Sequence, residues 1–147
     1  MKANRPFLVL LRIVALSSLL WSLPAVLLPG RCAGSPLEAG SPAPPFDLGW
    51  LAEEGTIGSS TLFGESPFTV LVIWNRGCPR CTKIALGMPA FADSLRREDI
   101  RVVGVLFGPD DKDALKDFLW DNNVLVPHLW DPDARTAADY GLGFKSD

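Results

Sequence analysis

The stretch VLVIWNRGCPRC, residues 70–81, joins an apolar run to a closely spaced pair of cysteines. The run starts two residues earlier and reads FTVLVIW over residues 68–74, mostly β-branched and aromatic side chains. This length and composition predict a strand that is buried on both faces, as in a parallel sheet. Cys78 and Cys81 follow after a short turn, so the pair is expected at the junction between this strand and the next helix.

Strands and helices alternate along the chain from residue 46 onward. The predicted elements are a hairpin within 46–62, strands at 68–74, 100–107 and 124–130, and helices at 78–97, 109–122 and 133–140. In the first of these helices, Leu86, Phe91 and Leu95 supply apolar positions, while Gly87 and Pro89 are expected to kink or split it. The alternation predicts an α/β fold that contains a parallel element.

The N-terminal region has the composition of a targeting segment. Lys2 and Arg5 precede an apolar run over residues 7–28, an arrangement typical of a secretory signal peptide. Arg12 interrupts the run, and its length leaves an uncleaved membrane anchor as the alternative. Either segment would place the rest of the chain outside the cytoplasm, in the periplasm or on the outer face of the cytoplasmic membrane.

Composition divides the chain into three parts. Residues 1–32 are the signal peptide or anchor, residues 33–45 form a linker rich in Pro, Gly and Ser, and residues 46–147 form the folded domain.

The whole chain carries 14 basic and 17 acidic residues. Four of the basic residues lie within residues 1–32, so the remainder has 14 − 4 = 10 basic residues and a net charge of −7. An acidic domain has no electrostatic footprint for nucleic acid, and membrane contact is expected only through the N-terminal segment.

The cysteine pair has the setting of a reactive dithiol. A cysteine at a helix N-terminus meets unpaired backbone N–H groups and the positive end of the helix dipole, and both favour the thiolate. Pro79 suits the first helical turn, and Arg80 adds a positive charge that should lower the thiol pKa further. The spacing allows a disulfide between Cys78 and Cys81. In the reduced pair, Cys78 would attack a partner disulfide, and Cys81 would resolve the mixed disulfide.

Other uses of the pair are less well supported by the sequence. A structural zinc site usually has four ligands, whereas the chain offers this pair and a single histidine, His128. No metal and no cofactor are therefore expected. A static disulfide is a second alternative, but so short a loop would constrain the unfolded chain little. His128 is expected on the surface or in packing, and Glu53, Glu54 and Glu65 are loop-like candidates for a base near the dithiol.

The motifs, taken in order, resemble the extracytoplasmic thioredoxin-like proteins of the TlpA and ResA type. The resemblance rests on GSPAPPFDL at 40–48, on VLVIWNRGCPRC at 70–81, and on VVGVLFG and KDFLWDNNVLVPHLWDPDARTAADYGLG within 102–143. It implies a thioredoxin-like fold and a secreted or anchored thiol–disulfide oxidoreductase without a cofactor. Family members often act as reductants in cytochrome c maturation, so protein dithiols or disulfides and a membrane electron donor are the implied partners. The match makes Cys78 the nucleophile, Cys81 the resolving thiol and Trp74 an aromatic residue near the site.

The chain departs from that family in three ways. Gly77 stands where the family commonly has an aromatic residue, and Pro89 lies further along the helix than the usual proline. The family also continues into a proline loop, two further strands and a helix, which the sequence lacks after residues 140–141. The chain is thus expected to be C-terminally truncated, with a sheet edge at residues 68–74 left uncovered.

Two alternative functions stay open at this point. The first is an inactive, truncated fragment of such an oxidoreductase. The second is a peroxiredoxin, which shares the fold and reduces peroxides. Peroxiredoxins use a Thr or Ser three residues before their cysteine, and Asn75 occupies that position here.

Overall fold

The structure is a computed structural model, and it describes residues 36–142. The predicted leader at 1–32, the start of the linker and the last five residues lie outside the described residues. Within residues 36–142, no helix is long and apolar enough to cross a membrane.

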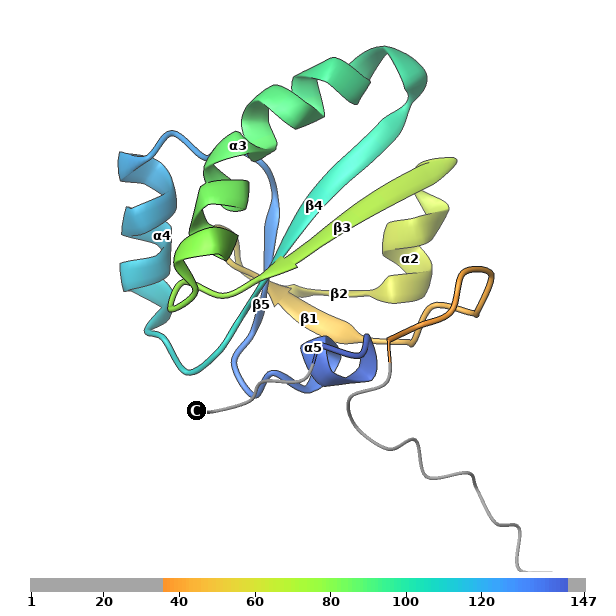
Figure 1. Cartoon of the computed structure of the whole chain (residues 1–147), viewed down its shortest axis with the longest axis horizontal. Helices are drawn as coiled ribbons and strands as arrows, with labels where there is room; N and C mark the ends of the chain where they lie inside the picture. The colour runs from red at the N-terminus through yellow and green to blue at the C-terminus, as the bar shows by residue number, and fades with distance from the viewer. Residues whose placement is uncertain (1–35, 143–147) are drawn as a thin grey trace, which may run out of the picture. The chain divides into compact units, whose positions relative to one another are not determined.

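The described part is built on one mixed sheet with the strand order β2-β1-β5-β4-β3 (Figure 1). The strands are β1 (Asp47–Trp50), β2 (Thr56–Gly58), β3 (Phe68–Trp74), β4 (Ile100–Phe107) and β5 (His128–Asp131). The helices are α2 (Ser59–Gly64), α3 (Pro79–Leu95), α4 (Lys112–Asp121) and α5 (Arg135–Asp139), with a 3₁₀ turn at Arg96–Glu98. Strands β3, β4 and β5 are parallel, whereas β1 pairs antiparallel with both β2 and β5.

The β3–α3–β4 unit is the parallel element predicted from the sequence. Parallel neighbours need a long crossover, and α3 supplies it here. The two strands pair without interruption from Phe68 opposite Ile100 to Trp74 opposite Leu106. Because parallel strands end at the same edge of the sheet, the segments that follow β3 and β4 emerge together.

Helices cover both faces of this sheet (Figure 1). On one face, α3 and α4 bury Met88 and Leu115 against the core cluster that contains Trp74. On the other face, Leu62 of α2 packs with residues of β4 and β5, and Tyr140 after α5 packs beside them. Strand β4 lies between β5 and β3, and its last six residues are buried, which accounts for its unbroken apolar sequence.

Most of the predicted elements are confirmed. The hairpin forms from β1 and β2, and β3 and β4 have the predicted bounds. Helix α3 is continuous from Pro79 to Leu95 with Pro89 inside it, so it is not split, and Figure 1 shows that it is curved along its length. Its buried residues are Ala85 and Met88, whereas Leu86 and Phe91, two of the apolar positions named from the sequence, are 45% and 44% exposed. Helix α2 was not predicted, because its six residues are too few to show a helical period.

Strand β3 packs on both faces, as predicted, but most of it is only half-buried: Val70 and Val72 pack against the cluster that contains Trp74, and Leu71 and Ile73 pack against the cluster that contains Leu62. Among the described residues β3 pairs only with β4, so residues 68–74 form one edge of the sheet, as predicted. Five of its seven residues are half-buried, and Phe68 is 68% exposed. The edge carries no charged side chain, proline or bulge, which are the features that usually protect an edge strand from pairing with another chain.

This edge leads to a prediction about self-association. Phe68→Lys should reduce aggregation of the purified chain on heating, because a lysine on an exposed edge strand opposes edge-to-edge pairing. Since Phe68 is largely exposed, the free energy of unfolding should change by no more than about 0.5 kcal/mol. Light scattering during a thermal ramp measures the effect. A control, Leu125→Lys, alters another exposed residue away from the sheet edge and should leave the aggregation rate unchanged.

Candidate active site

The two cysteines lie where β3 ends and α3 begins, as predicted. Cys78 is the N-cap residue of α3, with an extended backbone (φ −101°, ψ 107°), and Pro79 occupies the first turn. The missing N–H of a proline costs nothing there, and its fixed φ suits the start of a helix. The sequence Cys-Pro therefore sets both the end of the loop and the start of the helix.

Cys78 and Cys81 form a disulfide, with their Cα atoms 5.2 Å apart. The backbone N–H of Cys81 also donates a hydrogen bond to Sγ of Cys78 at 3.2 Å. Both residues are half-buried, and Cys81 packs against the core cluster of the α3 face. In the reduced state, the same N–H and the helix dipole would stabilise a thiolate on Cys78, which is the chemistry of a low-pKa cysteine.

Asn75 braces the loop that carries Cys78. Its Oδ1 accepts a hydrogen bond from the backbone N–H of Gly77 at 2.7 Å, and its Nδ2 donates to the carbonyl oxygen of Phe107 at 2.8 Å. The backbone N–H of Cys78 donates to the Asn75 carbonyl oxygen at 3.3 Å. Asn75 thus ties the loop after β3 to the end of β4. The sequence carries a signal for this role, because the side chain of an Asn often bonds the backbone N–H two residues further along the chain in a turn.

Trp74 lies beneath the loop and not on its surface. It is 1% exposed, and its ring contacts Phe118 and His128 at centroid distances of 6.2 and 5.8 Å. The indole therefore supports the end of β3 from within the core. The role predicted for Trp74 in shaping the site remains a prediction.

Arg80 is exposed between the two cysteines, and within residues 36–142 it makes no ion pair. We expect Arg80→Gln to raise the pKa of the reduced Cys78 thiol, because a nearby cation favours the thiolate. The pH dependence of alkylation by iodoacetamide measures this pKa. Arg97→Gln removes the same charge beyond the far end of α3 and serves as the control. Equal alkylation profiles for Arg80→Gln and the wild-type chain would contradict the prediction.

None of the three glutamates considered as a base for the dithiol is buried. Glu53, Glu54 and Glu65 are all exposed, and Glu65 forms an ion pair with Arg101 at the start of β4. Within the described residues, no group of three His, Cys, Asp or Glu side chains could hold a metal ion. The site consequently consists of the disulfide, the start of α3 and the loop held by Asn75.

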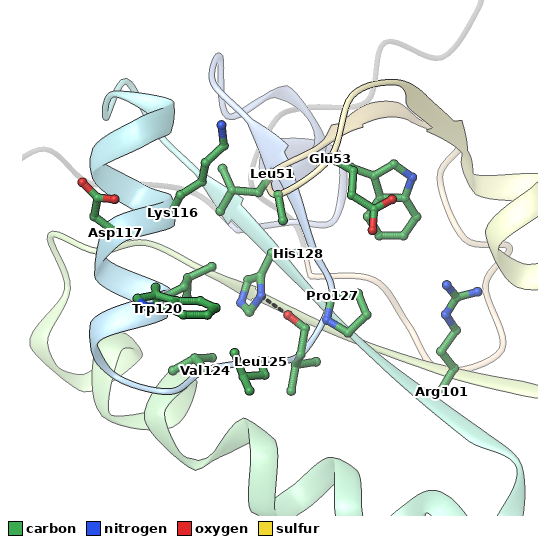
Figure 2. Close-up of a pocket in the computed structure, with 14 residues that line it drawn as sticks. Leu51, Glu53, Arg101, Lys116, Asp117, Trp120, Val124, Leu125, Pro127 and His128 are labelled. Carbon is green, nitrogen blue, oxygen red and sulfur yellow. Dashed lines mark hydrogen bonds between the residues drawn. The ribbon is translucent and has the colours of Figure 1, made fainter.

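His128 is buried, so of the two positions expected for it, on the surface or in packing, the packing position is the one observed. It is 3% exposed and lies in the wall of a pocket of about 650 Å³ (Figure 2), together with Trp120 and Leu125. Because a carbonyl oxygen can only accept, Nδ1 donates to the Val126 carbonyl oxygen at 2.6 Å. Nε2 has no hydrogen-bond partner among the described residues. The pocket is lined by neither cysteine, so it is separate from the dithiol.

Burial of His128 predicts a dependence of stability on pH. Desolvation lowers the pKa of this imidazole below 6.5, and the hydrogen bond to Val126 offsets only part of that effect. The unfolded chain therefore binds more protons, so stability is full above about pH 6.5 and falls as the pH drops below that value. The free energy of unfolding, measured by urea titration at pH 7.5 and 5.5, should fall more in the wild-type chain than in His128→Gln. An equal decrease in both chains would mean that His128 does not titrate on unfolding.

Comparisons with known proteins agree with this geometry. A sequence model of the AhpC/TSA family matches residues 39–146. A protein from Chlorobium tepidum, described as a thiol:disulfide interchange protein DsbE, is 25% identical; the match covers 73% of this chain and 72% of that one, with a TM-score of 0.61. A secreted thiol-disulfide isomerase from Corynebacterium glutamicum is 23% identical over 80% and 72% of the two chains, with a TM-score of 0.60.

A third solved structure is a secreted disulfide oxidoreductase from Mycobacterium tuberculosis, which is 23% identical. That match covers 68% of this chain and 70% of the other, with a TM-score of 0.55. Among curated proteins, none matches the chain significantly. Together with the sheet order and the parallel β3–α3–β4 unit, these structures confirm the thioredoxin-like α/β fold.

Proposed function

Because the chain belongs to the AhpC/TSA family, we propose that it is a thiol–disulfide oxidoreductase that exchanges disulfides with protein partners through Cys78 and Cys81. The observation that carries this proposal is the disulfide at the N-terminus of α3, at the end of a parallel strand in a thioredoxin-like domain. A structural bridge would add little here, since it closes a loop between residues only three apart. The N-terminus of a helix, in contrast, stabilises the thiolate of a reactive cysteine.

The reaction balances through two exchange steps. In the reduced chain, the Cys78 thiolate attacks a partner disulfide, forms a mixed disulfide and releases one partner thiolate. Cys81, as a thiolate, then attacks Sγ of Cys78 and releases the second partner thiolate. The partner disulfide is reduced to two thiols, and the chain is oxidised to the Cys78–Cys81 disulfide. The reverse sequence would oxidise a partner dithiol.

We also propose a cellular location and a class of partner for the chain. The solved relatives described as secreted, and the leader predicted from residues 1–32, support a location outside the cytoplasm. The resemblance to TlpA and ResA proteins and the likeness to a protein described as DsbE support a reductant of envelope proteins, including those of cytochrome c maturation. A membrane electron donor would then return the disulfide to the dithiol.

Turnover of a protein disulfide tests the proposal. The purified chain, with dithiothreitol as electron donor, should reduce the disulfides of insulin faster than dithiothreitol alone, and Cys78→Ser should abolish the difference. Circular dichroism would serve to check that both proteins are folded. Equal rates for the wild-type chain and Cys78→Ser would refute the proposed activity and would favour the alternative of an inactive chain.

Peroxide reduction is a second candidate, because the family match does not distinguish it from disulfide exchange. The structure gives one observation against it. Asn75 stands where a peroxiredoxin has Thr or Ser, and both ends of its amide are occupied in bracing the loop. Rapid consumption of hydrogen peroxide that depends on Cys78 would favour this second function over the first.

A further inference from the structure

The surface around the dithiol has a charge opposite to that of the domain as a whole. Between Glu65 and Asp93 the sequence has no acidic residue, but it has three basic ones: Arg76, Arg80 and Lys83. The chain outside the leader is acidic as a whole, with 17 acidic and 10 basic residues, these three included. These three side chains, which we call the cationic rim, lie before, between and just after the two cysteines.

The cationic rim is available to a partner. All three side chains are exposed, and none forms an ion pair within the described part of the chain. The Arg76 guanidinium lies over the Phe118 ring at 5.8 Å from its centroid, and Thr82 Oγ1 donates to the Arg76 carbonyl oxygen at 3.2 Å. These contacts hold Arg76 beside the start of α3. Arg80 and Lys83 are three residues apart in the same helix, so they project from one face.

Two acidic residues that follow β4 already have partners within the chain, Asp111 and Asp113. The segment after β4 emerges at the same edge of the sheet, and it carries Asp110, Asp111 and Asp113. Asp111 caps α4 by accepting hydrogen bonds from the backbone N–H groups of residues 113 and 114, at 3.1 and 3.0 Å. Asp113 pairs with Lys116 at 2.9 Å. Neither carboxylate pairs with the cationic rim, so the rim is open to an acidic partner.

We propose that the cationic rim selects protein partners whose reactive cysteines are flanked by acidic residues. This inference rests on the proposed function and adds the class of partner to it. An acidic segment would be drawn toward Cys78 by the cationic rim, while the acidic remainder of the domain would repel it elsewhere. A basic segment would be repelled by the cationic rim. The preference should appear mainly in the rate of association.

Exchange with small disulfides of different charge tests this inference. Two peptides of equal length, each carrying one disulfide, would have either four Glu or four Lys residues beside it, and 2-hydroxyethyl disulfide is the neutral probe. The reduced chain is compared with the double variant Arg76→Gln/Lys83→Gln, which leaves Arg80 and its effect on the thiol in place. The control, Arg96→Gln/Arg97→Gln, removes the same charge roughly 20 Å away along α3.

In 20 mM salt, the wild-type chain should react on the order of 10-fold faster with the acidic peptide than with the basic one. The ratio should fall to about 3 or less in Arg76→Gln/Lys83→Gln, stay near 10 in the control, and approach 1 in 0.5 M salt. A wild-type ratio of 1, or an equal loss in both double variants, would overturn the inference. Failure to react with the neutral disulfide would instead refute the proposed function, so the two failures are distinguishable.

Discussion

Replacing Cys81 by serine should convert a short-lived intermediate of the exchange reaction into a stable covalent complex. In the proposed reaction, Cys81 is the only described thiol that can attack the mixed disulfide from within the chain, because its sulfur lies within bonding distance of Cys78. Without it, release depends on a thiol from solution. Attack within a molecule corresponds to effective molarities of about 10⁵ M or more, so the lifetime of the mixed disulfide should rise by several orders of magnitude.

Non-reducing gel electrophoresis measures this result. Cys81→Ser, incubated with a protein that contains a disulfide, should give a band at the summed mass that dithiothreitol removes. Cys78→Ser is the matched control, since it keeps one thiol in the same turn of α3 but lacks the attacking group at the N-cap position. A complex formed by Cys78→Ser and not by Cys81→Ser would reverse the two roles.

The resemblance and the local sequence were sufficient to predict much of the site. The apolar run 68–74, the proline after Cys78 and the helix that follows are signals contained in a few neighbouring residues. Such signals can be recognised in a short segment alone, because backbone geometry and helix capping act within one turn. The disulfide itself follows from the same local geometry.

The features that could not be predicted depend on contacts between distant segments. That β3 is only half-buried depends on which segments lie beside it, and its apolar sequence is equally typical of a fully buried strand. The bracing role of Asn75 requires the carbonyl oxygen of Phe107, 32 residues away in the sequence. The position of His128 in the interior also depends on a neighbour, since β4 must leave room for its ring.

That room is provided by Gly104, which lies opposite His128 in the pairing of β4 with β5. A Cβ atom placed on Gly104 would overlap three atoms of the imidazole, and the ring is also packed against Trp74. The histidine cannot withdraw to solvent easily, because it is 3% exposed and its Nδ1 is held by the Val126 carbonyl oxygen. Glycine is therefore required at position 104 for a steric reason that the sequence alone does not reveal.

Gly104→Ala should accordingly destabilise the chain by about 3 kcal/mol, because an added methyl group in a packed core must displace its neighbours. Gly87→Ala is the matched control: nothing lies within 4 Å of a Cβ there, and alanine should stabilise α3 by about 0.5–1 kcal/mol. The double variant Gly104→Ala/His128→Ala should be less destabilised than the sum of its single variants, since removing the ring makes space for the methyl group. Urea unfolding of the four variants gives these free energies. Additive single effects would show that the two residues do not compete for one space, and the steric account of position 104 would then be wrong.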